Sequence, residues 1–520
     1  MTLVMELNSP YQSWLGQSAN IINQRSTVPS HQMPVAIFSR VRTFIEPKLN
    51  RLAGSPEDAN SWGGGSVNRR ILSAATTVAR LVILVKTASL AKEMLIARKF
   101  GASDALDAFY IALLLPSFLG AVIDTSFNAA FIPIYIEARE KEDSTTANRL
   151  FSNISVFNIA VLALVAAILA GLQRWLLPII GSGFGPQKLA LARPLFFLFL
   201  ISMSLVGLSA LWRAALNAHD RFTLASIAPI SNPIAIVILL MAVGHRWGIY
   251  ALAAGSVLGT VGELAIVGCG LYLLGVPLMP RWYGVDSWTR RVLWQYAPTV
   301  TGALLMGGTT LVDPAMAAML GSGSVSALNY AYKLPALVLN IGLSSLSIAI
   351  LPSFSRLSAK ENWREMRRVL LTYTGLLALV TIPVTGLLIV FSRPLVSIFF
   401  QGGAFTAADT TLVVHAQMMF CLEIPFYSVA ILYVRAISSL KRNNLIMWGT
   451  SISVSANVAL NILFMRLIGL PGIALSTSAV YALNCGYLSL MLFRALRQHE
   501  RATSAAPIPL QMMPSEGSAD

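Results

Sequence analysis

Long apolar segments separated by short polar interruptions run through the chain from Arg69 to about residue 497. A helix that spans the hydrocarbon core of a bilayer needs about 20 mostly apolar residues. The segments predict about twelve such helices, near residues 71–97, 104–136, 149–177, 190–216, 222–244, 247–275, 289–319, 325–352, 366–392, 409–438, 443–467 and 472–495. We therefore predict an all-α polytopic membrane protein.

The two ends of the chain differ from this pattern. Residues 1–66 are rich in Ser, Asn, Pro and Gly, and their longest apolar stretch, residues 33–38, is too short for the core of a signal peptide. We expect a flexible cytoplasmic arm over residues 1–66 and a flexible cytoplasmic tail over residues 499–520.

Recurring dipeptides indicate an internal repeat. Leu115-Pro116 recurs 219 residues later as Leu334-Pro335, and Arg213-Ala214 recurs 222 residues later as Arg435-Ala436. The repeat unit contains six predicted helices, an even number, so both halves enter the membrane in the same direction. Parallel repeats of this kind pack around a central cavity. The predicted six-helix halves are residues 67–280 and 281–498.

Composition and charge agree with a membrane protein. Hydrophobic residues make up 55% and charged residues 12% of the chain, which excludes an ordinary soluble domain and a disordered chain. Lys and Arg are about twice as frequent in the loops on the N-terminal side as in the opposite loops, so the positive-inside rule predicts cytoplasmic termini. The net charge of +15 then reflects cytoplasmic loops rather than a nucleic-acid partner.

Several cations fall inside predicted spans, where each costs at least about 2.5–3.5 kcal/mol unless it has a partner, a cavity or a function. Arg80, Lys86 and Lys92 lie in the first span, and Lys333 lies in the eighth. Cations near the start of both halves would converge on one cavity and favour an anionic substrate group such as a phosphate. The alternative is structural: the lysines pair with acids, while Arg80 and Lys92 extend towards the membrane interfaces.

Acidic residues in the first two spans accompany these cations. Lys86 and Glu93 share a helix face, and Lys92 lies roughly 120° away, so the polar stripe is broad and suits a water-filled cavity. We predict Glu93, Asp107 and Asp124 as cavity acids. The alternative is that Glu93 and Asp107 neutralise the lysines as structural pairs.

A second polar group lies in the later spans. Asp313 belongs to the seventh span, Asn457 and Asn461 share one face of the eleventh, and Thr477 belongs to the twelfth. One carboxylate with amide and hydroxyl oxygens could ligate a small hard cation. Polar contacts between helices explain these residues equally well. Pro314, directly after Asp313, is expected to interrupt the seventh helix.

Four other intramembrane charges have no partner that the sequence reveals. Glu263 and Glu423 are interpreted as structural, and the repeat-related Arg213 and Arg435 as anchors at the cytoplasmic ends of their helices. The three cysteines are scattered in apolar runs and predict neither a disulfide nor a metal site.

Catalytic motifs are weak. The glycine-rich stretch 181–185 joins two membrane helices rather than a strand and a helix, so it is a poor match to a phosphate-binding loop. The five histidines are too dispersed for a metal site, and no loop is long enough for a catalytic domain. We expect a transporter rather than an enzyme, with no cofactor other than a coupling monovalent cation or proton.

A resemblance to a known family rests on four segments, residues 86–93 (KTASLAKE), 97–102 (ARKFGA), 107–109 (DAF) and 127–133 (FNAAFIP). They resemble the opening of the MurJ (MviN) lipid II flippases, which belong to the multidrug/oligosaccharidyl-lipid/polysaccharide exporter superfamily. Residues 321–326 and 330–334 are also similar to this family, and the resemblance covers roughly residues 69–497.

The resemblance implies alternating access that moves an undecaprenyl-pyrophosphate-linked oligosaccharide from the cytoplasmic to the periplasmic leaflet of the bacterial inner membrane, for peptidoglycan or cell-envelope polysaccharide synthesis. It implies that Lys86, Lys92 and Lys333 stand where the family has cavity arginines, and that Glu93, Asp107 and Asp124 stand at its acidic positions. It implies a monovalent-cation site at Asp313, Asn457, Asn461 and Thr477. The family has fourteen helices, two more than the pattern predicts here.

Other functions remain open from the sequence. An exopolysaccharide repeat-unit flippase would use the same chemistry, a drug/cation antiporter of the superfamily would place acids rather than lysines in the cavity, and a membrane enzyme would need a catalytic cluster on a loop. The expected partners are a lipid-linked pyrophosphate and membrane lipid, without nucleic acid, and we expect a monomer.

Overall fold

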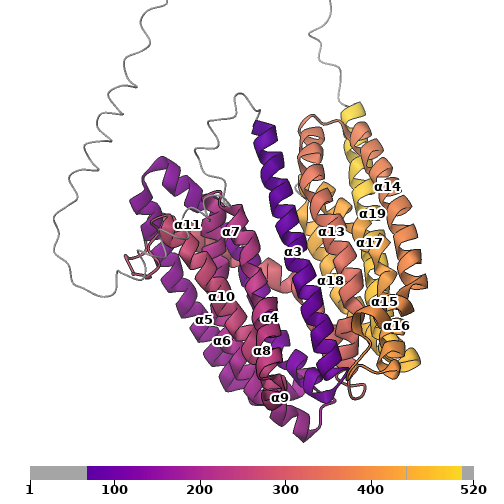
Figure 1. Cartoon of the computed structure of the whole chain (residues 1–520). Helices are drawn as coiled ribbons and strands as arrows, with labels where there is room; N and C mark the ends of the chain where they lie inside the picture. Colours follow the sequence, from indigo (N-terminus) through magenta and orange to yellow (C-terminus); the bar gives the residue numbers. More distant parts are fainter. Residues whose placement is uncertain (1–66, 441, 506–520) are drawn as a thin grey trace, which may run out of the picture. The chain divides into compact units, whose positions relative to one another are not determined.

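The computed structural model describes residues 67–440 and 442–505. The chain divides into two units, Met1–Arg70 and Ile71–Asp520, and the second contains the helix bundle (Figure 1). Its described residues form helices joined by short loops, with one isolated β-bridge between Gly402 and Phe405.

The helices of the first half are α3 (Val67–Phe100), α4 (Asp104–Lys141), α5 (Ser144–Ile180), α6 (Pro186–Ala218), α7 (Phe222–Ile227), η1 (Ala228–Ile230), α8 (Ser231–Ala242), α9 (Gly244–Trp247) and α10 (Ile249–Leu273). Those of the second half are α11 (Ser287–Gly307), α12 (Thr309–Ala317), α13 (Ser324–Ala359), α14 (Trp363–Val390), α15 (Ser392–Phe400), α16 (Ala407–Cys421), α17 (Glu423–Ser439), α18 (Asn443–Ile468) and α19 (Leu470–Ala505).

Among the described residues, nine helical segments are long and apolar enough to cross a membrane. They are α4, α5, α6, α7 to α8, α10, α14, α16 to α17, α18 and α19. The all-α polytopic architecture predicted from the sequence is confirmed. Three further long helices, α3, α11 and α13, lie where three more spans were predicted, and the count of twelve stays a prediction.

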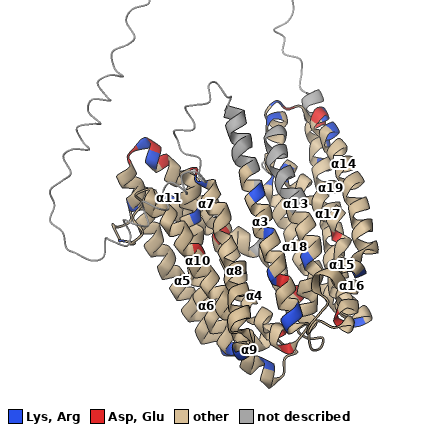
Figure 2. Ribbon diagram, in the orientation of Figure 1, with Lys and Arg blue, Asp and Glu red and all other residues tan. Residues whose placement is uncertain are grey.

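Polar side chains at helix ends fix where two important helices begin. The hydroxyl of Ser103 caps α4, so Asp104 and Asp107 lie in its first turn. Thr406 and Asp409 form a reciprocal capping box at the start of α16. Charged residues also occur away from helix ends, and Figure 2 shows Lys and Arg at several levels along α3.

The interruption predicted at Pro314 lies instead at Gly308, between α11 and α12. The Gly307-Gly308 pair is the weakest helix-forming point in this segment. Because α12 begins again at Thr309, Pro314 lies inside it and forfeits only the hydrogen bond to the carbonyl of Thr310.

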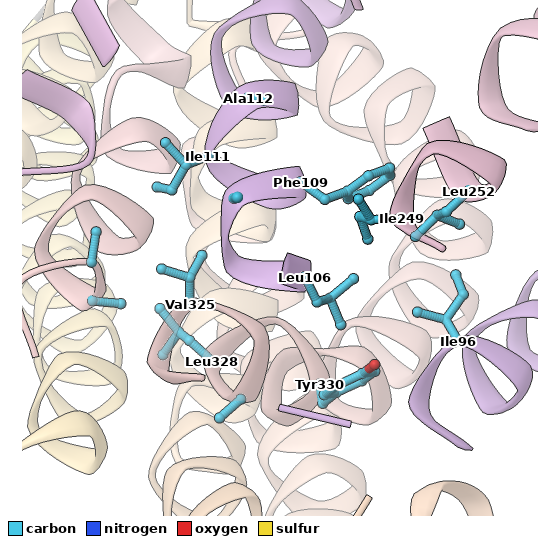
Figure 3. Packing of buried hydrophobic residues seen from close by; sticks show 14 of the residues in the cluster. Ile96, Leu106, Phe109, Ile111, Ala112, Ile249, Leu252, Val325, Leu328 and Tyr330 are labelled. Carbon is cyan, nitrogen blue, oxygen red and sulfur yellow. The ribbon is translucent and has the colours of Figure 1, made fainter. Parts of the chain in front are cut away.

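A buried hydrophobic cluster joins the two halves where α3 ends and α4 and α13 begin, a region named here the closed end. It contains Ile96 of α3, Leu106 and Phe109 of α4, and Val325 and Tyr330 of α13 (Figure 3). Burial of apolar side chains from both halves in one cluster holds the halves together at this end. Two other clusters each lie within a single half.

Candidate functional site

Two lysines and a glutamate from different halves meet in one cluster. Glu93 of α3 is 7% exposed, and its Oε1 lies 2.9 Å from Nζ of Lys92 and 3.1 Å from Nζ of Lys333 on α13. Its other carboxylate oxygen, Oε2, is buried and has no hydrogen-bond partner in the described part of the chain. One carboxylate between two ammonium groups leaves a net charge of +1, so the cluster can still attract an anion.

The other two cations of α3 lie outside this cluster. Arg80 and Lys86 are both exposed, and Lys86 precedes Lys92 by six residues, or about 9 Å of helix. The structure therefore brings Lys92, Glu93 and Lys333 together and leaves Arg80 and Lys86 farther along α3 from the closed end.

Asp107 joins the two halves. Its side chain is fully buried, and Oδ1 accepts hydrogen bonds from the backbone N–H and the hydroxyl of Ser326 at 2.8 and 2.6 Å. Oδ2 accepts the N–H of Gly323 at 2.7 Å, and Nζ of Lys188 lies 3.4 Å away. The carboxylate thus caps the N-terminus of α13, where the helix dipole favours an anion. We name Asp107, Gly323 and Ser326 the inter-half latch; this aspartate was expected to line a cavity.

Glycines allow backbones from the two halves to touch beside the latch. A Cβ atom built on Gly183 would lie 2.1 Å from the carbonyl oxygen of Ala318, and one on Gly101 would lie 2.3 Å from that of Ala404. Any larger side chain at these positions would have to push the halves apart. The closed end is therefore shut by direct backbone contact as well as by the hydrophobic cluster.

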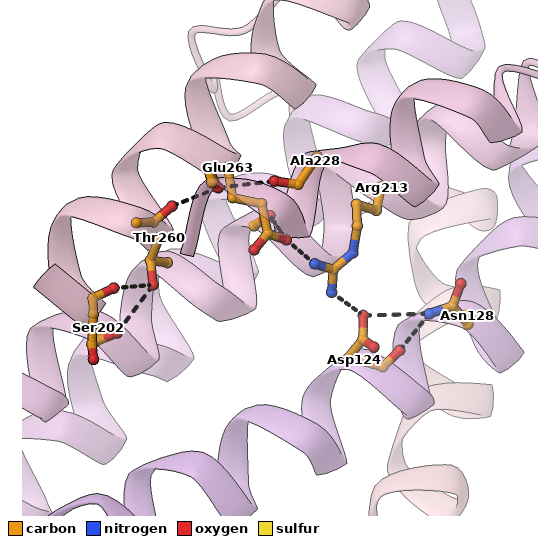
Figure 4. A network of polar contacts seen from close by, with 11 residues as sticks. Asp124, Asn128, Ser202, Arg213, Ala228, Thr260 and Glu263 are labelled. Atoms are coloured by element: carbon orange, nitrogen blue, oxygen red, sulfur yellow. Dashed lines mark hydrogen bonds and ion pairs between the residues drawn. The ribbon is translucent and has the colours of Figure 1, made fainter. Parts of the chain in front are cut away.

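Asp124, Arg213 and Glu263 form an ion triad inside the first half (Figure 4). Nη2 of Arg213 lies 2.8 Å from Oδ1 of Asp124, and Nη1 pairs with Oε1 of Glu263. The hydroxyl of Ser209 donates to the same Oε1 at 3.0 Å. Sequence reasoning missed this group because the partners of Arg213 lie 89 and 50 residues away, on α4 and α10. Asp124 is thus a partner of Arg213, and Arg213 is the centre of a triad rather than a simple anchor.

The second predicted polar group does meet at one point. Nδ2 of Asn457 and Nδ2 of Asn461 donate to Oδ1 of Asp313 at 3.0 and 2.8 Å, and the hydroxyl of Thr477 donates to Oδ2 at 2.8 Å. Oδ1 of Asn461 is buried and has no partner among the described residues. Because amide oxygen and nitrogen can exchange places by rotation, the group offers a carboxylate, two amide oxygens and a hydroxyl. This donor set fits a monovalent cation.

Asp313, Asn457 and Thr477 line a cavity of about 660 Å³ in the second half. A second groove, of about 1230 Å³, lies between α11, α17 and α18. The two share Val434 and Thr450 in their walls, so the cavity continues into the groove.

Comparison with known proteins assigns the chain to a family. Residues 96–509 match the family model described as lipid II flippase MurJ. The chain belongs to the MurJ lipid II flippase family. The resemblance seen in the sequence is thereby confirmed.

Individual MurJ relatives match over most of their length. The lipid II flippase MurJ of Burkholderia cenocepacia is 26% identical over 449 residues, which cover 82% of this chain and 84% of the relative. The probable lipid II flippase MurJ of Thermotoga maritima is 23% identical over 408 residues, which cover 78% of this chain and 81% of the relative.

Solved structures share the fold. A lipid II flippase MurJ in an inward closed conformation superposes with a TM-score of 0.69 at 21% identity, covering 82% of this chain and 90% of that chain. An inward-facing multidrug resistance MATE family transporter of the MOP superfamily gives 0.68 at 12% identity, covering 82% of this chain and all of that chain. MurJ and MATE structures therefore have the same arrangement of helices as this chain.

Proposed function

We propose that this chain moves lipid II from the cytoplasmic to the periplasmic leaflet of the bacterial inner membrane by alternating access, for peptidoglycan synthesis. The observation that carries the proposal is the cluster of Lys92, Glu93 and Lys333, which joins the two halves in a member of the MurJ family. The cluster carries net positive charge, as a lipid-linked pyrophosphate requires, whereas a drug/cation antiporter would place acids there. Nothing specific favours an exopolysaccharide unit over lipid II.

The cluster suggests how cargo controls the two halves. A pyrophosphate carries more negative charge than one carboxylate, so it can displace Glu93 and take the N–H donors of Lys92 and Lys333. Because Lys92 belongs to α3 and Lys333 to α13, binding one anion between them favours one relative position of the halves. Binding energy is thereby available for closing the cavity around the head group.

The inter-half latch would be the opposing gate. In the predicted orientation, with both termini in the cytoplasm, the closed end faces the periplasm. Release of lipid II to that side requires Asp107 to leave Gly323 and Ser326 and the glycine contacts to separate. The described arrangement then corresponds to the state that is shut towards the periplasm.

A monovalent cation would bias the cycle. Asp313, Asn457, Asn461 and Thr477 would hold it, and the ion gradient would supply a driving force that the head group itself lacks. A proton on Asp313 is the alternative coupling ion. We take the transporter to work as a monomer, since the cargo-binding cluster and the latch are both complete within one chain.

The test is a Lys333→Gln variant, which removes one ammonium group from the cluster. We expect lipid II flipping in proteoliposomes to fall at least about tenfold, because a charge-assisted contact is worth roughly 1.5–3 kcal/mol, and we expect the variant not to complement a strain depleted of its own lipid II flippase. Arg368→Gln is the matched control, since the side chain of Arg368 is 79% exposed and pairs only with Glu365 on the same helix. A folded, inserted Lys333→Gln protein that transports lipid II at the unmutated rate would show the proposal to be wrong.

A further inference from the structure

The two repeat-related arginines have different surroundings. Arg213 in the first half is neutralised by Asp124 and Glu263. Repeat offsets of 219 and 224 residues place Leu343 and Tyr487 at the matching positions of the second half, so both acids are missing from the sequence there.

Arg435 consequently has no acidic partner. Within residues 67–440 and 442–505 it makes no ion pair with a carboxylate, and its Nε is buried without a hydrogen-bond partner. A buried guanidinium N–H that is left unpaired is unfavourable, and a ligand that accepts from it would relieve the cost. The side chain also lies in the wall of the 660 Å³ cavity, where a ligand can reach it.

Arg435 lies at the opposite end of this cavity from the cation group. The cavity wall follows one face of α17 from Tyr427 to Arg435, about 12 Å of helix, and one face of α18 from Asn457 back to Ile446, about 16 Å. Val434, beside Arg435, also lines the larger groove, so this end is the open one. Asp313, the one acid in the cavity wall, lies at the other end.

The neighbours of Arg435 narrow the chemistry of the ligand. Asn484 lines the same cavity, and its buried Oδ1 has no donor among the described residues. A planar guanidinium binds a carboxylate through two parallel N–H···O bonds, and its single charge matches a monovalent anion rather than a pyrophosphate. The amide oxygen of Asn484 can accept a hydroxyl or N–H close to that carboxylate.

We propose that Arg435, with Asn484 beside it, binds a carboxylate of the transported head group, at a subsite separate from the Lys92, Glu93 and Lys333 cluster that takes the pyrophosphate. This inference rests on the proposed function, since it assumes a lipid-linked head group in the cavity. It gives the second half a role in choosing the cargo: head groups with a carboxylate at the right distance from the pyrophosphate bind in preference to neutral ones.

The experiment compares two probes on the full chain in lipid nanodiscs. One is lipid II with its head-group carboxylates free, and the other is lipid II with those carboxylates converted to neutral methyl amides. We expect the unmutated protein to bind the free acid about tenfold more tightly. Arg435→Gln should lose this preference and bind the methyl amide as well as the unmutated protein does. Arg435→Lys, which keeps the charge but loses the planar fork, should retain part of the preference and serves if the Gln variant does not fold.

Other outcomes overturn the inference. If Arg435→Gln keeps the full preference for the free acid, Arg435 does not bind the carboxylate. If it weakens both probes equally, Arg435 acts on the pyrophosphate or on the fold. Lys333→Gln, measured in parallel, should weaken both probes equally; if it weakens neither, the proposed pyrophosphate site fails, while the response of Arg435→Gln to the two probes still decides the carboxylate subsite.

Discussion

Buried charges in this protein differ in how well they are compensated. Glu93 faces two lysines, Arg213 faces two carboxylates, and Glu423 is fully buried with neither carboxylate oxygen hydrogen-bonded to a described residue. In a low-dielectric interior a charge is stable only when it is paired, and a group without a partner is costly. Each site therefore predicts a different response to substitution.

Removing Arg213 should be strongly destabilising. An Arg213→Met variant leaves Asp124 and Glu263 facing each other without a cation, and breaking a buried ion pair in this way costs about 3–5 kcal/mol, less here because Asp124 is 38% exposed. Thermal unfolding in detergent would measure the loss. Arg291→Gln, which breaks an exposed pair with Glu137, is the control and should change stability by less than about 1 kcal/mol. Equal effects of the two substitutions would contradict a structural role for the triad.

Removing Glu423 should have the opposite sign. Glu423→Met keeps the side-chain length and removes two buried oxygens that lack hydrogen bonds, so the free energy of unfolding should rise by about 1–3 kcal/mol. The same thermal measurement applies, with Glu423→Gln expected to fall between Met and Glu. A loss of stability in Glu423→Met would mean that the carboxyl group has a stabilising partner.

Sequence spacing predicted some of these residue groups and not others. Asn457 and Asn461 are four apart on one helix, so their shared face followed from helix geometry, and their meeting with Asp313 agrees with that prediction. Arg213 could not be matched to Asp124 and Glu263, because the rotation of one helix about its axis relative to another depends on packing over the whole bundle.

At the scale of elements, the apolar runs predicted the helices well, and the contacts between helix ends were not predictable. An apolar run of about 20 residues must form a helix in a membrane, so α4, α6, α10 and α18 follow from composition. The turns before α4 and α13 instead meet through glycines and the capping aspartate Asp107, and nothing in the local sequence of either turn specifies the other.

Two glycines in the turn between α5 and α6 give a matched test of that contact. In Gly183→Ala, the new methyl group would lie 2.1 Å from the carbonyl oxygen of Ala318, so the closed end should open, at a cost of about 1–3 kcal/mol to the closed arrangement. In Gly185→Ala, the new methyl group meets nothing within 4 Å and should have no effect. Spin labels on this turn and on the turn between α12 and α13 would report the distance by pulsed electron resonance. Unchanged distances in Gly183→Ala would rule out a tight contact.

At the scale of the whole molecule, the two halves share a repeat but have diverged in charge. The first half holds its arginine in a triad, while the second half has an unpaired arginine at one end of a cavity and the Asp313 group at the other. The contacts that join the halves, the latch and the Lys92–Glu93–Lys333 cluster, are polar and few, so small changes in binding energy are enough to shift their relative position.

This asymmetry predicts that a monovalent cation stabilises the protein through the second half alone. A ligand that binds only the folded state raises the free energy of unfolding by about 2.7 kcal/mol at 100 times its dissociation constant. Unfolding temperature should therefore rise when choline chloride is replaced by sodium or lithium chloride at constant ionic strength, which keeps screening unchanged. Asp313→Asn, which removes the one carboxylate of the group, should abolish the rise, and Glu365→Gln, on the exposed face of α14, should leave it intact. A rise that survives Asp313→Asn would place the cation elsewhere, and a proton-coupled cycle would show no rise in either salt but a dependence on pH that Asp313→Asn removes.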